Sequence, residues 1–202
     1  MKSIYIRVDL SYHVDIFYAI DYNKSIKKKR LVYKTGYSIV FEYIWYWLII
    51  LFSAGVVTLP AIVKPANVSH ISIYYILFCI VFDFWLMLNV FFLNAFVEIQ
   101  GQQKDLNKED IINTLSEFYN LKNLNTSGNK IIRYVRLTGF FHGGRVVSVL
   151  LKDDIIYLNI TTLLRYDGLS CFNGLYNYYK CRRIANRFKE LQTIRNIPSD
   201  NQ

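Results

Sequence analysis

The segment best suited to ligand binding runs from Gly139 to Arg145. Its glycines let backbone amides approach an anion closely, and its arginine can pair with phosphate. The segment lacks the spacing and the final Lys-Ser/Thr of a P-loop, and two expected strands flank it. Two interpretations stay open. It is a lipid- or anion-binding loop, or it is a flexible strand connection with a buried phenylalanine pair; the candidate residues are Phe140, Phe141, His142 and Arg145.

Asp83 is a second candidate, because it is the one charged residue in an apolar segment over residues 71–97. A carboxylate in such surroundings is costly unless it is protonated or paired, and it marks a functional site by default. Asn94 follows at a spacing that returns to nearly the same helical face. With Ser53 and Thr58 they form a predicted polar seam. The seam serves an ion, a proton or a basic partner, or it holds helices together by hydrogen bonds.

The other reactive residue types predict no catalytic or metal site. No hydrolase or metalloprotease motif is present, and we expect a non-enzymatic protein with no metal and no cofactor. The histidines are far apart, and the cysteines, which lack metal-ligand spacing, predict reduced thiols. These residues are His13, His70, His142, Cys79, Cys171 and Cys181.

Asp83 lies in the second of two long apolar segments. No charged side chain occurs over residues 43–63, and Asp83 is alone over residues 71–97. About 20 apolar residues in a helix cross the roughly 30 Å hydrocarbon core of a bilayer. Neither segment has the polar face of a surface helix. We therefore expect a transmembrane hairpin of two helices within residues 39–98, joined by a short outer loop.

Much of the excess positive charge lies beside this hairpin. The 202 residues carry 24 Lys and Arg against 15 Asp and Glu, a net charge of +9. Basic residues beside a span favour the cytoplasmic side and attract the anionic inner leaflet. The sequence thus predicts a multi-pass protein of the inner (plasma) membrane with both termini in the cytoplasm, and nucleic-acid binding is not favoured. The basic run comprises Lys24, Lys27, Lys28, Lys29, Arg30 and Lys34.

The regions on either side of the hairpin are expected to be cytosolic. Residues 1–38 contain an alternating strand over 3–10 and a helical pattern over 11–22. Residues 99–202 predict a small α+β domain, which the N-terminal strand could complete. Its elements are a helix over 107–121, a loop over 123–129, a strand over 130–138, a hairpin of strands over 146–152 and 155–161, and a final helix over 175–194.

The final helix is expected to be amphipathic. Its basic face is a solvated surface or a docking site for anionic headgroups or an acidic partner. The residues expected to face inward are Cys181, Ala185, Phe188 and Leu191, and those expected to face outward are Lys180, Arg183, Arg187 and Lys189.

Residues 3–60 resemble the YcxB-like bacterial membrane proteins. The resemblance rests on the strand Ile4-Tyr-Ile-Arg-Val, the aromatic segment from Phe17 to Tyr22, and the basic run that leads into paired apolar segments. It implies a small bacterial membrane protein with a cytosolic domain after the hairpin. The C-terminal α+β region departs from the short β-rich domain of that family.

Two functions follow from these features. The first is an inner-membrane protein that anchors a cytosolic protein-recognition domain, as a subunit of a larger membrane complex or a defence or immunity component. The alternative is an oligomeric membrane-perturbing effector or small channel, gated by its cytosolic domain through Asp83. In both, the partners are membrane lipids and other protein chains, in a homo- or hetero-oligomer.

Overall fold

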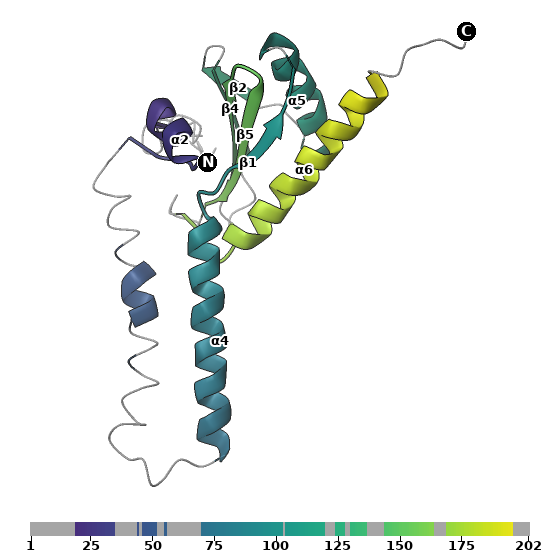
Figure 1. Ribbon diagram of the computed structural model, residues 1–202. Coiled ribbons are helices and arrows are strands. Elements are labelled where there is room, and N and C mark those ends of the chain that lie inside the picture. Colours follow the sequence, from purple (N-terminus) through teal and green to yellow (C-terminus); the bar gives the residue numbers. More distant parts are fainter. Residues whose placement is uncertain are drawn as a thin grey trace, which may run out of the picture.

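A computed structural model describes residues 19–34, 44, 46–51, 55, 70–102, 104–119, 124–127, 130–136, 144–163 and 169–195. A five-stranded antiparallel sheet is packed between helices, and one long helix projects from it (Figure 1). In chain order the elements are α2 (Tyr22–Lys28), α4 (His70–Phe92), β1 (Val97–Gln100), α5 (Lys104–Phe118), β2 (Leu124–Ser127), β3 (Ile131–Arg136), β4 (Arg145–Lys152), β5 (Ile155–Thr162) and α6 (Gly174–Arg195).

The centre of the sheet is the β4–β5 hairpin, which confirms the hairpin predicted around residues 153 and 154. The sheet order is β1-β5-β4-β3-β2, and Lys152 pairs with Ile155 beside the turn. Asp153 adopts a left-handed conformation there, with φ of 48°, which aspartate tolerates better than most residues. β3 lies inside the strand that the sequence predicts over 130–138.

Both faces of the sheet are buried, and the period-2 alternation of β4 sorts its side chains between them. Val147, Val149 and Leu151 face one core with α5 and α6. Val146 and Leu150 face a second core, with residues from α2, α4 and the chain between them. A sheet covered on both faces explains why β4 is apolar almost throughout.

Helix α6 packs on the sheet as its amphipathic pattern predicts. Cys181, Ala185 and Phe188 are buried, at 4% exposure or less, while Leu191 is half-buried. Thr162 hydrogen-bonds the buried Asn177, at 3.0 Å between its Oγ1 and the donating Nδ2. This bond helps to fix which face of α6 packs on the sheet.

The turn after α4 is held by the sheet. The last carbonyls of a helix have no partner within it. Asn159 on β5 donates from Nδ2 to the carbonyls of Leu93 and Ala95, at 3.3 and 2.9 Å. Leu31, in the chain after α2, donates its N–H to the Asn94 carbonyl at 2.8 Å. The C-terminal end of α4 is thus part of the folded domain.

Helices α4 and α6 meet at backbone contact. A methyl group at Gly174 would lie 1.9 Å from the carbonyl oxygen of Asn89, so only glycine permits this approach. The buried Asn89 accepts a hydrogen bond from the Leu175 N–H at 3.1 Å. An α4 side chain therefore satisfies a donor in the first turn of α6.

The prediction of a two-span transmembrane hairpin is wrong. Within the described ranges, no helix combines the length and the apolarity needed to cross a membrane. The first apolar segment is described only at residues 44, 46–51 and 55. In α4 the last turns pack against the domain on one side, where Leu86 and Asn89 are buried, so part of the apolar sequence serves this packing. The predicted multi-pass inner-membrane location and cytoplasmic termini are overturned by the same finding.

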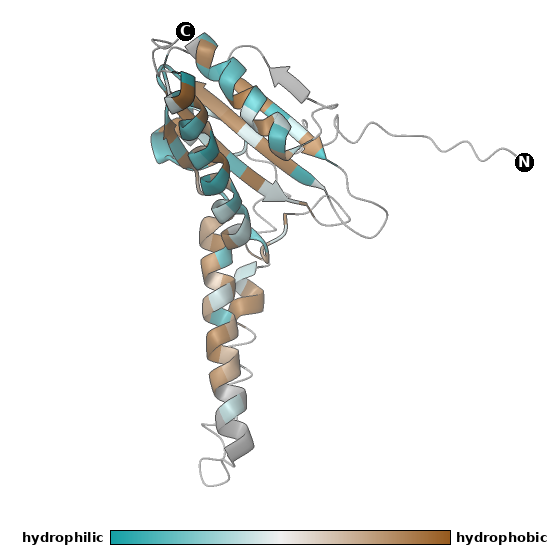
Figure 2. Cartoon of the chain, turned by 90° about the vertical axis from the view of Figure 1, so that its right-hand side faces the viewer, coloured by the Kyte–Doolittle hydropathy of each residue, from teal (hydrophilic) through white to brown (hydrophobic). Residues whose placement is uncertain are grey.

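Figure 2 shows that most of α4 is hydrophobic, and many of its large apolar side chains are exposed. The rings of Phe78, Phe82 and Trp85 stack one after another along the helix. The Trp85 ring also contacts that of Phe172, which lies just before α6. The exposed side chains are Tyr74, Leu77, Phe78, Ile80, Val81, Phe82, Phe84, Trp85, Met87 and Phe91.

Three local predictions also differ from the structure. β1 was expected as the end of a span, and β2 was expected as a loop. Both are instead edge strands of the sheet. The helix expected through Tyr22 instead begins there, with Asp21 as its N-cap. Asp21 accepts from the Lys24 N–H at 3.0 Å, and this bond lowers the pKa of its carboxyl group. The strand expected over residues 3–10 lies outside the described residues.

Candidate functional site

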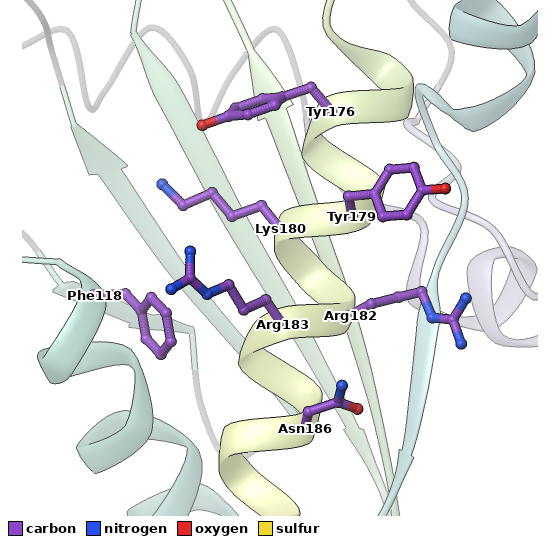
Figure 3. Close-up of a pocket in the computed structure, with 7 residues that line it drawn as sticks. All are labelled: Phe118, Tyr176, Tyr179, Lys180, Arg182, Arg183 and Asn186. Carbon is purple, nitrogen blue, oxygen red and sulfur yellow. The ribbon is translucent and has the colours of Figure 1, made fainter.

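A groove about 680 Å³ in volume lies between the end of α5 and the exposed face of α6. Tyr176, Lys180 and Arg183 lie one turn apart and point from α6 toward Phe118 of α5 (Figure 3). Tyr179, Arg182 and Asn186 complete the lining from the neighbouring face of α6. The groove thus combines aromatic rings with cations, and none of the described residues in its lining is a carboxylate.

Two of the cations near the groove rest on aromatic rings. The Lys180 Nζ lies 4.7 Å from the centroid of the Tyr119 ring, and the Arg145 guanidinium carbon lies 5.8 Å from that of Tyr176. Such contacts orient a cation without neutralising it. Burial raises the pKa of Tyr119, so this ring stays neutral beneath the lysine.

Four cations gather where β3, β4 and α6 meet, and we call them the cationic cluster: Arg136, Arg145, Lys180 and Arg183. Arg136 and Arg145 are direct partners in the β3–β4 register, and like charges in this position repel. Burial lowers the pKa of Lys180, and the positive charges of the three arginines lower it further.

No described carboxylate forms an ion pair with the cationic cluster. The sequence between Arg136 and Arg145 contains no Asp or Glu either. Four neighbouring cations that no described carboxylate pairs with repel one another, and this repulsion lowers the stability of the protein. This arrangement can bind an anion, whose charge would relieve the repulsion and whose oxygens match the arginine donors.

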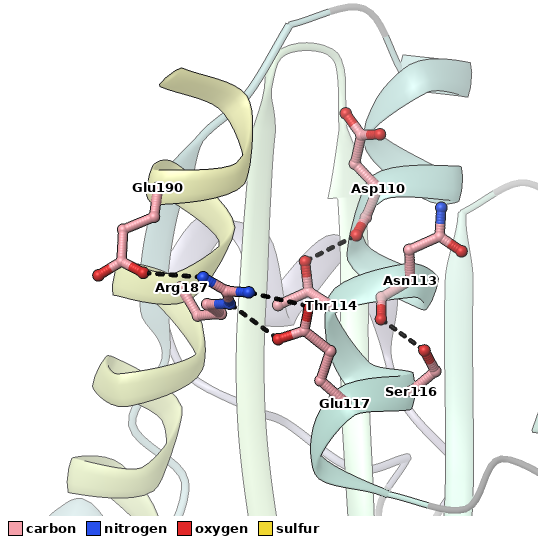
Figure 4. A network of polar contacts seen from close by, with 7 residues as sticks. All are labelled: Asp110, Asn113, Thr114, Ser116, Glu117, Arg187 and Glu190. Carbon is pink, nitrogen blue, oxygen red and sulfur yellow. Dashed lines mark hydrogen bonds and ion pairs between the residues drawn. The ribbon is translucent and has the colours of Figure 1, made fainter. Parts of the chain in front are cut away.

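Two arginines in the other half of α6 are ion-paired within the chain, and Figure 4 shows the pairs of Arg187. Arg187 donates to Glu117 of α5, at 2.8 Å from Nε, and to Glu190 at 3.2 Å. These bonds from Arg187 lower the pKa of Glu117. Arg195 pairs with Asp110 at 2.9 Å. Arg187 and Arg195 are therefore paired within the chain, whereas Lys189 in the same half of the helix is exposed.

Of the four candidate residues of the predicted binding loop, one is described. Arg145 belongs to the cationic cluster, whereas Phe140, Phe141 and His142 lie outside the described residues. The sequence predicted two further members of the cluster as exposed, because Lys180 and Arg183 were expected on the outer face of α6. Arg136 and the groove aromatics were missed, since only the strand register and the packing of α6 bring them together.

The predicted polar seam is only partly described. Asp83 lies half-buried in α4, while Asn94 lies in the turn beyond the end of that helix and is buried there. The two residues therefore do not share one helical face. Ser53 and Thr58 lie outside the described residues. Asn89 of α4 instead bonds to α6, by accepting from the Leu175 N–H.

The basic run forms α2 and the turn that follows it. Lys24 pairs with Asp21 at 3.3 Å, and Lys29 reaches Glu98 of β1 at 3.1 Å. Arg30 forms a backbone bridge with Ala95. Lys27, Lys28 and Lys34 are exposed. These contacts dock the run on the junction between α4 and β1.

Comparison with known proteins gives this site no precedent. The resemblance to YcxB-like proteins stays a prediction. The chain matches no family model, no curated protein and no solved structure.

Proposed function

We propose that this chain is a non-enzymatic recognition protein, whose α6 groove binds an acidic segment of a partner protein. The observation that carries the proposal is the cationic cluster, which has no carboxylate partner among the described residues although the same helix is ion-paired further along. The alternative of a small channel is not supported by any spanning helix within the described ranges.

The composition of the groove favours a protein partner. Arginine and tyrosine are enriched at protein interfaces, where they supply contact area and hydrogen bonds at low entropic cost. Tyr176 and Tyr179 are exposed by 56% and 63% beside the cations. A nucleic acid would need positive charge spread along its backbone, but the charge here is compact, and Arg187 and Arg195 are already paired.

A matched pair of charge reversals tests the proposal. The probe is a fluorescein-labelled 12-residue peptide of alternating Glu and Leu, and binding is measured by fluorescence anisotropy at 0.15 M salt. We expect Lys180→Glu to weaken binding about tenfold or more, because it places a carboxylate inside the cationic cluster. Lys189→Glu, on the same helix but more than a Debye length of about 8 Å away, should change affinity less than about twofold.

Other probes separate the partner classes. A labelled single-stranded oligonucleotide of equal charge should bind more weakly than the peptide, and a Lys/Leu peptide should not bind. Equal losses in the two reversals, or tighter binding of the oligonucleotide, would refute protein recognition by this groove.

A further inference from the structure

A second groove, about 560 Å³ in volume, lies between the helical residues 46–51 and the C-terminal half of α4. Trp47 and Ile50 line one wall, and Met87, Val90 and Phe91 line the other. Of the described residues in its lining, Arg30 alone is charged. Its volume is within the range of about 300–1,000 Å³ that is typical of small-molecule sites.

The folded domain anchors both walls of this groove. Tyr46, one residue before Trp47, is buried and donates its hydroxyl hydrogen bond to the Leu169 carbonyl. Ile50 and Val90 pack against the core between the sheet and α4. Trp47 and Phe91 nevertheless remain 50% and 64% exposed, so the walls leave apolar surface open between them.

Arg30 gives the groove a charge preference. Its neighbour Lys29 is paired with Glu98, but no described carboxylate pairs with Arg30. The backbone of Arg30 is held by a hydrogen bond from its N–H to the Ser25 carbonyl, at 3.2 Å. An arginine beside apolar walls fits a ligand with one carboxylate and a hydrocarbon tail, since arginine binds carboxylates through two parallel hydrogen bonds.

The volume argues against a docked helix. With a diameter of about 10 Å and a rise of about 5.4 Å per turn, one helical turn occupies roughly 400 Å³. The groove would hold little more than one turn, which is too short for helix-in-groove recognition with anchors at i, i+3, i+4 and i+7. An extended alkyl chain has no such requirement. We propose that this groove binds a monomeric long-chain fatty acid, with its carboxylate on Arg30 and its chain between Trp47 and Phe91.

Fluorescence of Trp47 provides a direct test. In a protein with Trp45→Phe and Trp85→Phe, Trp47 is the remaining tryptophan. We expect 9,10-dibromostearate, kept below its micelle concentration, to quench Trp47 saturably, because bromine quenches at contact. Competition by unlabelled acids should strengthen about fourfold for each added methylene between decanoate and tetradecanoate, the affinity equivalent of burying one such group.

Variants then test the two halves of the site. Arg30→Gln should weaken dodecanoate about tenfold and leave dodecanol unchanged, whereas Phe91→Ser should weaken both ligands. Lys28→Gln, an exposed neighbour in the same run, is the matched control and should change neither. Lys180→Glu should also leave dodecanoate binding unchanged, so failure of this proposal is distinct from failure of peptide recognition.

Three results would overturn the fatty-acid proposal. Dodecanoate and dodecanol could bind equally in the wild type, which would exclude a role for Arg30. Quenching could be linear without saturation, which would show unspecific partition. Quenching could also occur only when the brominated chain is carried in phosphatidylcholine vesicles, which would exclude a monomeric ligand.

Discussion

Gly174→Ala should destabilise the protein, although alanine is the better helix former. A methyl group there would lie 1.9 Å from the Asn89 carbonyl oxygen, 2.8 Å from its carbon and 2.9 Å from the Leu93 nitrogen. Ordinary contact needs about 3.5 Å, so α6 must move about 1.5 Å from α4. All three atoms belong to the backbone and cannot rotate away.

The magnitude follows from two opposing contributions. Overpacking of this kind costs about 1–3 kcal/mol, and the rigid backbone contacts place Gly174→Ala near the upper value. Alanine recovers up to about 1 kcal/mol through its helix propensity. The net loss in free energy of unfolding is therefore about 2 kcal/mol, which lowers the melting temperature by about 4–8 °C in a chain of this size.

Urea unfolding followed by far-UV circular dichroism measures this loss. The midpoint should fall while the slope stays unchanged, because the surface exposed on unfolding is the same. Gly55→Ala is the control, since no atom lies within 4 Å of a methyl group at that position. A Gly174→Ala protein as stable as the wild type would show that α4 and α6 do not touch at Asn89.

Three further predictions concern the helix junction and the charges of α6. Asn89→Leu should lower the free energy of unfolding by about 1–3 kcal/mol in the same urea assay, because it leaves the partly buried Leu175 N–H unpaired. The folded state lowers the pKa of Lys180, so urea stability of the wild type relative to Lys180→Met should rise between pH 7 and the ordinary lysine value of 10.5. Arg187 lowers the pKa of Glu117, so the stability advantage of the wild type over Arg187→Gln should be full above pH 4.5 and decline as acid titrates Glu117 in the folded state.

Each of these predictions has a control or a contrary outcome. Asn89→Asp keeps an acceptor at the start of a helix and should lose less stability than Asn89→Leu. Lys189→Met, at an exposed site on the same helix, should show no relative rise between pH 7 and 10.5. An Arg187→Gln deficit that persists undiminished at pH 2 would exclude an ionic origin for the Glu117 contact.

The elements with strong periodicity could be predicted from the sequence. The β4–β5 hairpin and α6 fall within a residue or two of their expected bounds, because alternation and helical spacing are long and uninterrupted there. β1 was hidden by the apolar run that precedes it. β2, with the sequence LNTS, has no apolar alternation, and its extended state follows from pairing with β3.

The long-range contacts could not be predicted in this way. Apolarity alone made α4 resemble a complete span, whereas burial of Leu86 and Asn89 places its last turns in the domain. The Asn89–Leu175 bond joins residues 86 positions apart, and no local pattern indicates it. The cationic cluster likewise depends on the pairing of Arg136 with Arg145, and the sequence between these two residues does not specify the strand register that pairs them.

The direct passage from α4 into β1 gives the molecule a mechanical property. β1 follows the helix after a short turn and is held to β5 by four register pairs, from Val97↔Leu158 to Gln100↔Ile155. Tension applied along α4 would pull β1 lengthwise, so its ladder is loaded in shear and the hydrogen bonds share the force instead of breaking one by one. The contact of α4 with α6 supplies a parallel attachment. Force applied to the projecting helix α4 would therefore reach the sheet and α6 together.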